Sequence, residues 1–519
     1  MREDDESRIT MPTSRRDFLR RVGATALGMS VGRMVLHADV GSESEELRKR
    51  LALDPLRPQY HLMPAANWMN DPNGPIYFGG RYHMFHQYNP ASSVWGDMHW
   101  AHATSKDMLH WRHEPVAIAP TSGGWDRDGV FSGSIVINEG EATAIYTGVL
   151  PPQSSEQATL RDGIHESREV QCLAIAQDDG LRRWKKLDEP IISSPPTGMQ
   201  VTGFRDPVVW REGEEWLLAL GSGLRDGGGA ILLYRSRDLR RWEYLHPLMM
   251  GARNPTKSEN PVDNGNMWEC PDFFPLGGKH VLLLSTMGKV SWKVGNYQER
   301  RFTPEKEGVV DWGAFYAAKS MLDKTGRRIL WGWIPETRAE AEYRAAGWAG
   351  AMSLPRILSV NAHGELEMQV IPEIATLRGS HVRIAGSSDG NKLEFVRIRD
   401  RAAQVSIDCR LKEKSDFLLR LENDGDKNFL DLKLAATPGG HELRVHPQAI
   451  PLTHNGAGDV QLRIFIDGSV AEIFANSTVA ITKRIYDGTK GPLRVRADGQ
   501  FSSLDIWQMR AISPDRLTT

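Results

Sequence analysis

The sequence predicts an all-β protein in which a five-bladed β-propeller is followed by a β-sandwich. A degenerate repeat is the first observation: residues 105–111, 178–184 and 236–242 each contain an acidic turn, a leucine and a tryptophan that opens a strand. Each repeat follows a short β-rich run such as residues 230–234, and the tryptophans are 73 and 58 residues apart. This spacing fits four-stranded propeller blades with loop insertions, and five such blades fit the length of residues 55–365.

The second observation is a different pattern toward the C-terminus. Residues 417–421 and 462–467 alternate between apolar and polar positions, with turn residues between the alternating stretches, which is typical of a β-sandwich. The segment that contains Pro372 interrupts the strand pattern and is expected to be a linker. The predicted organisation is a leader and linker at residues 1–45, a propeller catalytic domain at 46–367, a linker at 368–380 and a sandwich domain at 381–519.

Two groups of conspicuous side chains have structural interpretations. The repeat tryptophans Trp111, Trp184 and Trp242 are expected in the blade cores, because large aromatic side chains dominate core burial. Asp467 and Glu472 stand among apolar residues of an alternating stretch. They are therefore expected on the solvent face and in the turn of a hairpin.

The N-terminus reads as an export leader. Residues 14–21 contain the pair Arg15 and Arg16, and a mildly apolar run at residues 22–36 leads to a small-residue cleavage site at Ala38. The run is too short, and too interrupted by glycines and an arginine, to span a bilayer permanently. The alternative is a basic amphipathic helix of the protein itself. We expect export by the twin-arginine route to the periplasm or outside the cell.

Composition excludes some classes of protein. The chain has 519 residues, 40% of them hydrophobic, and a formal charge of −2, so it is long enough for two domains with separate cores. Its charges are interspersed and form no basic stripe of the kind that nucleic-acid binding requires. The expected substrate is therefore uncharged, and no nucleic-acid partner is expected.

The three cysteines are Cys172, Cys270 and Cys409. An odd number argues against a disulfide framework, even in an exported protein. Cys270 follows Glu269 directly, so two interpretations stay open: it is a small buried apolar residue, or it tunes the neighbouring acid by proximity.

Three acids stand on backbone stiffened by proline. Asp71 directly precedes Pro72, which pushes such a residue toward an extended conformation, and Asp206 repeats the arrangement before Pro207. Glu269 stands two residues before a proline. Each segment alone is an ordinary turn former. Three such acids, each near an aromatic ring or a guanidinium group, suggest a glycosidase.

Motifs around the acids add specificity. The motif Asn-Asp-Pro-Asn-Gly begins at Asn70 and contains Asp71. Downstream of it are an aromatic and histidine-rich run at residues 82–90, then Trp95 and His99–Trp100, and then residues 130–134. Together these segments resemble glycoside hydrolase family 32. The resemblance includes Arg-Asp-Pro at 205–207, Glu-Cys at 269–270 and later matches at 331–333, 347–348 and 354–356. The resemblance runs from about residue 58 to about residue 507, and Ala101 departs from the glycine of many members. It implies a five-bladed propeller followed by a β-sandwich module.

The resemblance also assigns roles to the acids. It implies that Asp71 is the nucleophile, that Glu269 is the acid and later the base, and that Asp206 is a third acid that holds fructosyl hydroxyls and stabilises the transition state. Retention requires the two reacting carboxylates to lie about 5 to 5.5 Å apart. Repulsion and burial then separate their pKa values. Arg205 is expected to keep Asp206 ionised.

Substrate-binding residues follow from the same comparison. Asn70, Gln87 and Ser132 offer neutral donors and acceptors that suit a polyhydroxylated ligand, and Arg205 lies beside the third acid. The resemblance places these side chains around the terminal fructosyl unit. The rings of Trp68, Trp95 and Phe131 are expected to form its apolar wall.

Neither a metal nor a cofactor is expected. Two His-x-x-His pairs occur, His83 with His86 and His99 with His102. Residues three apart on a strand face opposite sides, so neither pair can chelate as it would on a helix. The sequence contains no glycine-rich phosphate loop and no complete calcium loop.

The functional expectation is a retaining β-fructofuranosidase whose first substrate is sucrose. Hydrolysis of levan or inulin stays open, as does fructosyl transfer to a sugar acceptor in place of water. A sugar-binding propeller that has lost catalysis is the alternative from another class, and its usual sign would be replacement of one of the three acids. The sequence predicts neither the oligomeric state nor the leader cleavage position.

Overall fold

The computed structural model describes residues 46–513, apart from 48, 152–158, 161–165, 257, 259, 387–390, 400, 411–415, 424–427, 439, 453–458 and 487–491. The predicted leader and its twin-arginine motif lie outside the described residues. Within them, no helix is long and apolar enough to cross a membrane.

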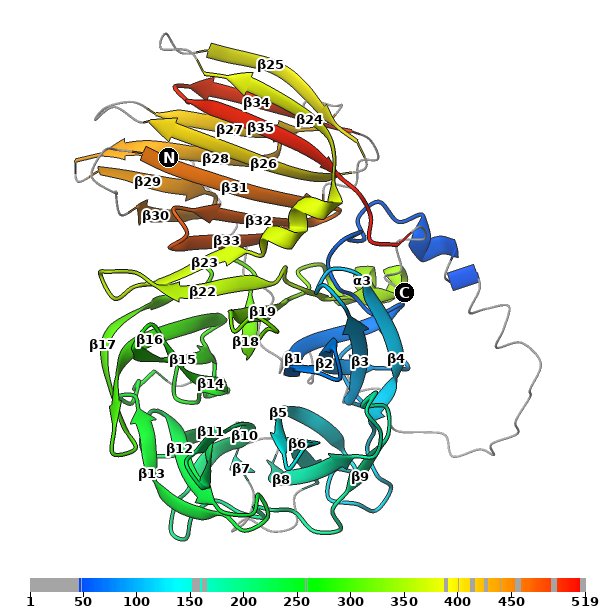
Figure 1. Cartoon of the computed structure of the whole chain (residues 1–519), viewed down its shortest axis with the longest axis vertical. Helices are drawn as coiled ribbons and strands as arrows, with labels where there is room; N and C mark the ends of the chain where they lie inside the picture. The colour runs from blue at the N-terminus through cyan, green and yellow to red at the C-terminus, as the bar shows by residue number, and fades with distance from the viewer. Residues whose placement is uncertain are drawn as a thin grey trace, which may run out of the picture.

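Five antiparallel sheets surround a central axis and form the propeller (Figure 1). Blade 1 contains β1 (Asn67–Phe78), β2 (Arg81–Asn89), β3 (His99–Ser105) and β4 (Trp111–Ile118), and blade 2 contains β5 (Gly129–Asn138), β6 (Glu141–Leu150), β8 (Glu166–Ala176), β9 (Trp184–Lys186) and the short β7 (Thr159–Leu160). Blade 3 contains β10 (Val201–Glu212), β11 (Glu215–Leu224), β12 (Gly229–Ser236) and β13 (Glu243–Met250), and blade 4 contains β14 (Glu269–Leu276), β15 (Lys279–Thr286), β16 (Lys289–Gln298) and β17 (Arg301–Val309). Blade 5 contains β18 (Tyr316–Leu322), β19 (Arg328–Ile334), β22 (Arg356–Val360), β23 (Leu366–Val370) and the short β21 (Ala351–Met352).

The ring of blades is closed. The innermost strands β1, β5, β10, β14 and β18 each contact the next, and β18 contacts β1. The short helix α3 (Glu340–Ala346) follows β19 and leads into β20 (Trp348–Ala349), which pairs in parallel with the start of β1. The predicted five-bladed propeller is therefore confirmed.

The sequence repeat is the turn that leads into the outer strand of three blades. In each turn an indole N–H donates to the carbonyl three residues earlier: Trp111 to Met108 at 3.1 Å, Trp184 to Leu181 at 3.0 Å and Trp242 to Leu239 at 2.9 Å. Those three acceptor residues have φ of 66°, 53° and 60°, in the left-handed region. Trp111 is buried, while the other two tryptophans are half-buried against their blade cores, as the sequence predicts.

Two six-stranded sheets form the sandwich, which lies beyond blade 5 in Figure 1. One sheet contains β24 (Arg378–Ala385), β35 (Ser503–Met509), β26 (Ala402–Arg410), β31 (Asp459–Asp467), β32 (Val470–Ala475) and β33 (Val479–Arg484), and the other contains β25 (Asn391–Ile398), β34 (Leu493–Gly499), β27 (Phe417–Glu422), β28 (Asn428–Thr437), β29 (Gly440–Val445) and β30 (Gln448–Leu452). A 3₁₀ helix, η1 (Pro372–Leu377), connects β23 to β24. The segment 368–380 thus includes the end of β23 and the start of β24.

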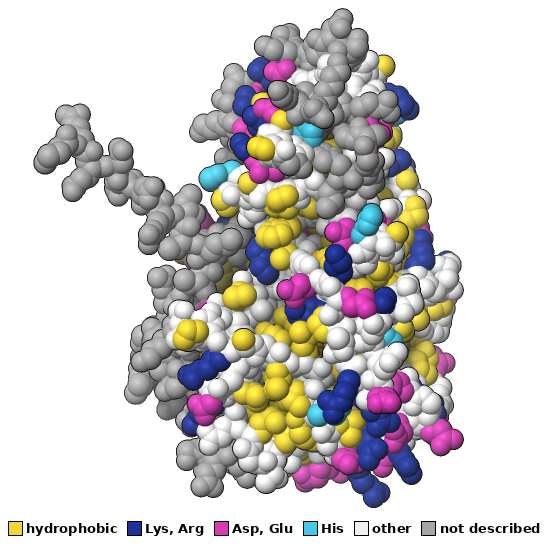
Figure 2. Space-filling model, turned by 90° about the vertical axis from the view of Figure 1, so that its left-hand side faces the viewer, with side chains coloured by type: hydrophobic (Ala, Val, Ile, Leu, Met, Phe, Trp, Pro, Cys, Tyr) yellow, Lys and Arg dark blue, Asp and Glu magenta, His cyan; other side chains and the backbone are white. Residues whose placement is uncertain are grey.

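The face of both domains in Figure 2 carries charged side chains of both signs, interspersed with apolar ones.

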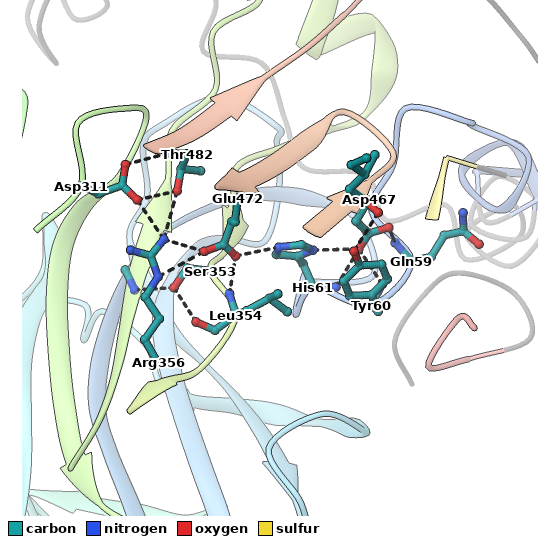
Figure 3. Close-up of polar contacts among 12 residues, drawn as sticks. Gln59, Tyr60, His61, Asp311, Ser353, Leu354, Arg356, Asp467, Glu472 and Thr482 are labelled. Carbon is teal, nitrogen blue, oxygen red and sulfur yellow. Dashed lines mark hydrogen bonds and ion pairs between the residues drawn. The ribbon is translucent and has the colours of Figure 1, made fainter. Parts of the chain in front are cut away.

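Asp467 and Glu472 do lie on a β31–β32 hairpin, but the expectation that they face solvent is wrong. Both side chains are 0% exposed. The backbone N–H groups of Gln59, Tyr60 and His61 donate to the Asp467 carboxylate at 2.6 to 3.0 Å (Figure 3). Alternation in a strand distinguishes the two faces of its sheet, but it cannot show that the propeller covers the outer face as well.

Arg356 of β22 joins the same buried network from the propeller side. Its Nη2 lies 2.5 Å from Glu472 and 2.9 Å from Asp311, and all three side chains are 0% exposed. Figure 3 shows these groups in one row that continues to His61 and Asp467. Since buried charges need partners, this row ties the sandwich hairpin to the propeller.

We expect Arg356→Met to lower the free energy of unfolding by about 3 to 5 kcal/mol, because it leaves Asp311 and Glu472 buried without their guanidinium partner. Denaturant unfolding of the purified protein measures the effect. The matched control is Arg444→Met, whose exposed side chain pairs with Glu442 on the sandwich surface and should change stability by less than about 0.5 kcal/mol. Equal losses in the two variants would contradict the interpretation.

His61 gives the interface a pH dependence. Burial alone would lower the pKa of this imidazole, but its contacts with Asp467 at 2.8 Å and Glu472 at 2.9 Å outweigh burial and raise the pKa from 6.5 to about 9. A raised folded-state pKa stabilises the fold fully below the unfolded value and loses that contribution as the pH rises through the folded value. The stability advantage of the wild type over His61→Gln should therefore shrink between pH 6.5 and about 9. An advantage that grows over this range in thermal unfolding would contradict the assignment.

Candidate active site

One backbone irregularity recurs in all five innermost strands. A bulge places two residues opposite one residue of the second strand, at 70 and 71, 131 and 132, 206 and 207, 270 and 271, and 317 and 318. Bulges redirect side chains and are frequent next to active sites. The three predicted acids all lie in these bulges or directly before one, so they are brought together around the propeller axis.

Asp206 does not have the extended conformation that a following proline favours. Its φ is 66°, and the corresponding bulge residues Cys270 and Ala317 have φ of 48° and 54°. The left-handed region costs a residue with a side chain about 1 kcal/mol or more. The bulge geometry therefore overrides the local effect of the following proline at Asp206 and Cys270.

Asp71 is held on two sides. Its Oδ1 accepts a hydrogen bond from Asn70 Nδ2 at 3.0 Å, and its Oδ2 accepts one from Ser132 Oγ at 2.7 Å. The Asn70 amide oxygen in turn accepts the indole N–H of Trp68 at 2.8 Å. The carboxylate is only 3% exposed, so its orientation is fixed.

Glu269 lies between a guanidinium and a phenol. Arg205 Nε and Nη2 donate to Glu269 Oε1 at 3.0 and 2.6 Å, and the hydroxyl of Tyr316 donates to Oε2 at 2.8 Å. Arg205, Glu269 and Tyr316 occupy the same register position, directly before the bulge, in three successive blades. Adjacent blades therefore build this row of contacts.

Cys270 connects the acids. Its backbone N–H donates to Asp206 Oδ2 at 2.9 Å, and its Sγ lies 3.4 Å from Asp206 Oδ2 and 3.5 Å from Asp71 Oδ2. Burial raises the pKa of the thiol well above its usual value, so the S–H is retained. Cys270 is thus a small buried residue, and its thiol also touches two of the three acids.

Arg205 favours the ionised form of Asp206, as expected, but the guanidinium does not set the net shift of the pKa. Burial raises the pKa of Asp206 to about 6, and the nearby charges of Glu269 and Asp71 add to the rise, while Arg205 only opposes it. The guanidinium N–H groups point to Glu269 and to Glu169 instead. Burial, more than the neighbouring guanidinium, therefore sets the pKa of Asp206.

The predicted wall residues gather in one apolar cluster. Trp68 lies 5.8 Å from Trp333 and 6.0 Å from Tyr343 between ring centroids, and Trp95 lies 6.0 Å from Phe131. Gln87 stands opposite the bulge of β1 and donates from Nε2 to the carbonyl of Val130 at 3.0 Å.

Sequence reasoning missed four residues at this site: Glu169, Tyr316, Trp333 and Tyr343. None of them stands beside a proline or another acid of the motifs, and their roles depend on contacts between blades. The tryptophan-rich segment at 331–333 was a signal for Trp333, but nothing in the sequence distinguished Glu169 from other acids.

His83 and His102, one from each predicted pair, pack against each other. His83 Nδ1 lies 3.0 Å from His102 Nε2, across two adjacent strands, and burial lowers the pKa of His83 to about 4. The described residues contain no group of three or more histidine, cysteine or acidic side chains that could hold a metal ion.

A fixed carboxylate and a second carboxyl group in contact with a guanidinium, both at the axis of a propeller, define a glycoside hydrolase of the paired-carboxylate class. The chain belongs to glycoside hydrolase family 32. The profile of the "Glycosyl hydrolases family 32 N-terminal domain" matches residues 61–370, and that of the "Glycosyl hydrolases family 32 C terminal" matches residues 377–508.

Several relatives are similar over most of the chain. A sucrose-6-phosphate hydrolase of Escherichia coli is 36% identical over 83% of this chain and 89% of its own. A levanase of Bacillus subtilis is 33% identical over 81% of this chain and 64% of its own. Among solved structures, fructan 1-exohydrolase IIa of Cichorium intybus is 27% identical, with a TM-score of 0.75 over 88% of this chain and 98% of its own. A β-fructofuranosidase of Bombyx mori, solved with sucrose, is 26% identical, with a TM-score of 0.74 over 92% of this chain and all of its own.

Proposed function

We propose that the protein is a retaining β-fructofuranosidase that releases terminal fructosyl units from sucrose. The observation that carries the proposal is the convergence of the acids: Cys270, next to Glu269 in the chain, lies within 3.5 Å of both Asp71 and Asp206. The names of relatives in family 32, among them invertase, β-fructofuranosidase and levanase, support a fructosyl substrate.

The reaction has two steps. Protonated Glu269 gives its proton to the glycosidic oxygen while Asp71 attacks the anomeric carbon of the fructosyl unit, so glucose leaves and a fructosyl ester forms. Glu269, now ionised, takes a proton from water, which attacks the same carbon and releases fructose with retained configuration. Asp206 holds fructosyl hydroxyls and stabilises the charge that develops on the ring.

A substrate panel tests the proposal: sucrose, sucrose 6-phosphate, raffinose, inulin and levan, with the anomer of the product followed by NMR. Release of fructose from sucrose as the β anomer supports it. The inverted anomer, or no release from any member, contradicts it. Faster hydrolysis of inulin or levan would identify a fructan hydrolase, and oligofructosides formed at high sucrose would identify a transferase.

Export is part of the proposal, supported by the twin-arginine motif alone. Fractionation of cells that carry the full chain or an Arg15→Lys, Arg16→Lys double variant tests it. Loss of the exported activity in the variant supports the twin-arginine route, whereas equal activity in the cytoplasmic fraction of both contradicts it.

A further inference from the structure

Glu169 of β8 is a buried acid beside the active site that the mechanism above does not use. It is 2% exposed. Its Oε1 and Oε2 accept from Arg205 Nη1 at 3.2 and 3.4 Å, and Oε2 also accepts the backbone N–H of Phe204 at 2.7 Å. The backbone contact fixes the carboxylate, and the carboxylate in turn fixes the arginine.

Arg205 therefore lies between two carboxylates. Its Nε and Nη2 face Glu269, and its Nη1 faces Glu169. A guanidinium is planar and its donors have a rigid geometry, so a partner at one end sets the orientation of the other. Both ends are almost fully buried, with 4% of the arginine side chain exposed.

This arrangement resolves an electrostatic conflict in the first step of the reaction. Glu269 must carry a proton, yet a guanidinium at 2.6 Å favours its ionised form. The charge of Glu169 opposes this effect, because it offsets the positive charge that reaches Glu269. The other titratable and charged groups that face Glu269 or the acids beside it are Asp71 on β1, Asp206 on β10, Cys270 on β14, and Tyr316 and Lys319 on β18.

We propose that Glu169 is a positioning residue that fixes and partly neutralises Arg205, so that Glu269 keeps its proton across the working pH range. The inference rests on the proposed function. It concerns the electrostatics of Glu269 and assigns no substrate contact to Glu169.

The test is the pH profile of kcat/KM for Glu169→Gln, which removes the charge and nearly keeps the shape. With sucrose, the basic limb of the profile should move to lower pH by about one unit. With an aryl fructofuranoside, whose leaving group needs no proton, the basic limb should move far less. Glu422→Gln is the matched control: this buried acid of β27 in the sandwich is 4% exposed, and its removal should leave both limbs unchanged.

A second pair of variants keeps the inference testable if the glutamine variant does not fold. Glu169→Asp and Glu169→Asn have nearly the same shape and differ chiefly in charge, so the basic limb of the asparagine variant should lie about one unit below that of the aspartate variant. Unmoved basic limbs, or losses of rate without any shift of the profile, would overturn the inference. If the wild type itself releases no fructose, the proposed function fails instead.

Discussion

Asp71→Asn is expected to lower kcat on sucrose by on the order of 10⁴-fold or more, because an amide cannot form the fructosyl ester. The variant should remain folded, since asparagine has the same shape and can still accept the Ser132 hydroxyl through its amide oxygen. Initial rates with sucrose, together with thermal unfolding, measure both effects. KM should change much less than kcat, because the lost interaction forms only as the reaction proceeds.

The control for this variant is Asp179→Asn, on an exposed turn between β8 and β9. It removes one carboxylate far from the axis and should leave kcat unchanged. If Asp71→Asn keeps more than about a tenth of the wild-type kcat, Asp71 is not the nucleophile.

Glu269→Gln is expected to lower kcat/KM on sucrose by about 10² to 10⁴-fold, because glutamine cannot protonate the leaving oxygen. The loss should be much smaller on an aryl fructofuranoside, whose leaving group departs without a proton. For that substrate the second step then becomes limiting, because water has lost its base, and a burst of the aryl alcohol should precede slow turnover.

Stopped-flow absorbance of the released alcohol measures the burst. Equal losses on sucrose and on the aryl substrate, with no burst, would contradict the acid and base roles of Glu269.

The predictions that held depend on local sequence. The turn repeat at Trp111, Trp184 and Trp242 is complete within seven residues each time. The conformation of these turns therefore does not depend on contacts with the rest of the fold. The acid motifs are equally local. Each lies in the bulge of an innermost strand or directly before one, so the closed ring of blades brings Asp71 and Glu269 toward one axis.

The predictions that failed depend on partners far away in the sequence. Asp206 was expected to be extended, but a bulge set by pairing with β11 gives it a φ of 66°. Its pKa rises although Arg205 lowers it, because burial outweighs the guanidinium. Asp467 and Glu472 are buried because the propeller covers their hairpin. The contact of Glu169 with Arg205 depends on β8 and β10 lying side by side, so the sequence alone could not predict it.

The five bulges repeat one backbone arrangement in the innermost strand of every blade. In blade 5 the two bulge residues are Ala317 and Ala318, at the register positions that Asp206 and Pro207 occupy in blade 3. Both alanines are buried, and Ala317 has a φ of 54°, so a larger side chain at either position would meet a packed core or add backbone strain. One backbone frame thus presents an acid and a proline in blade 3 and two small packing residues in blade 5, so the side chains and not the frame decide what each blade contributes.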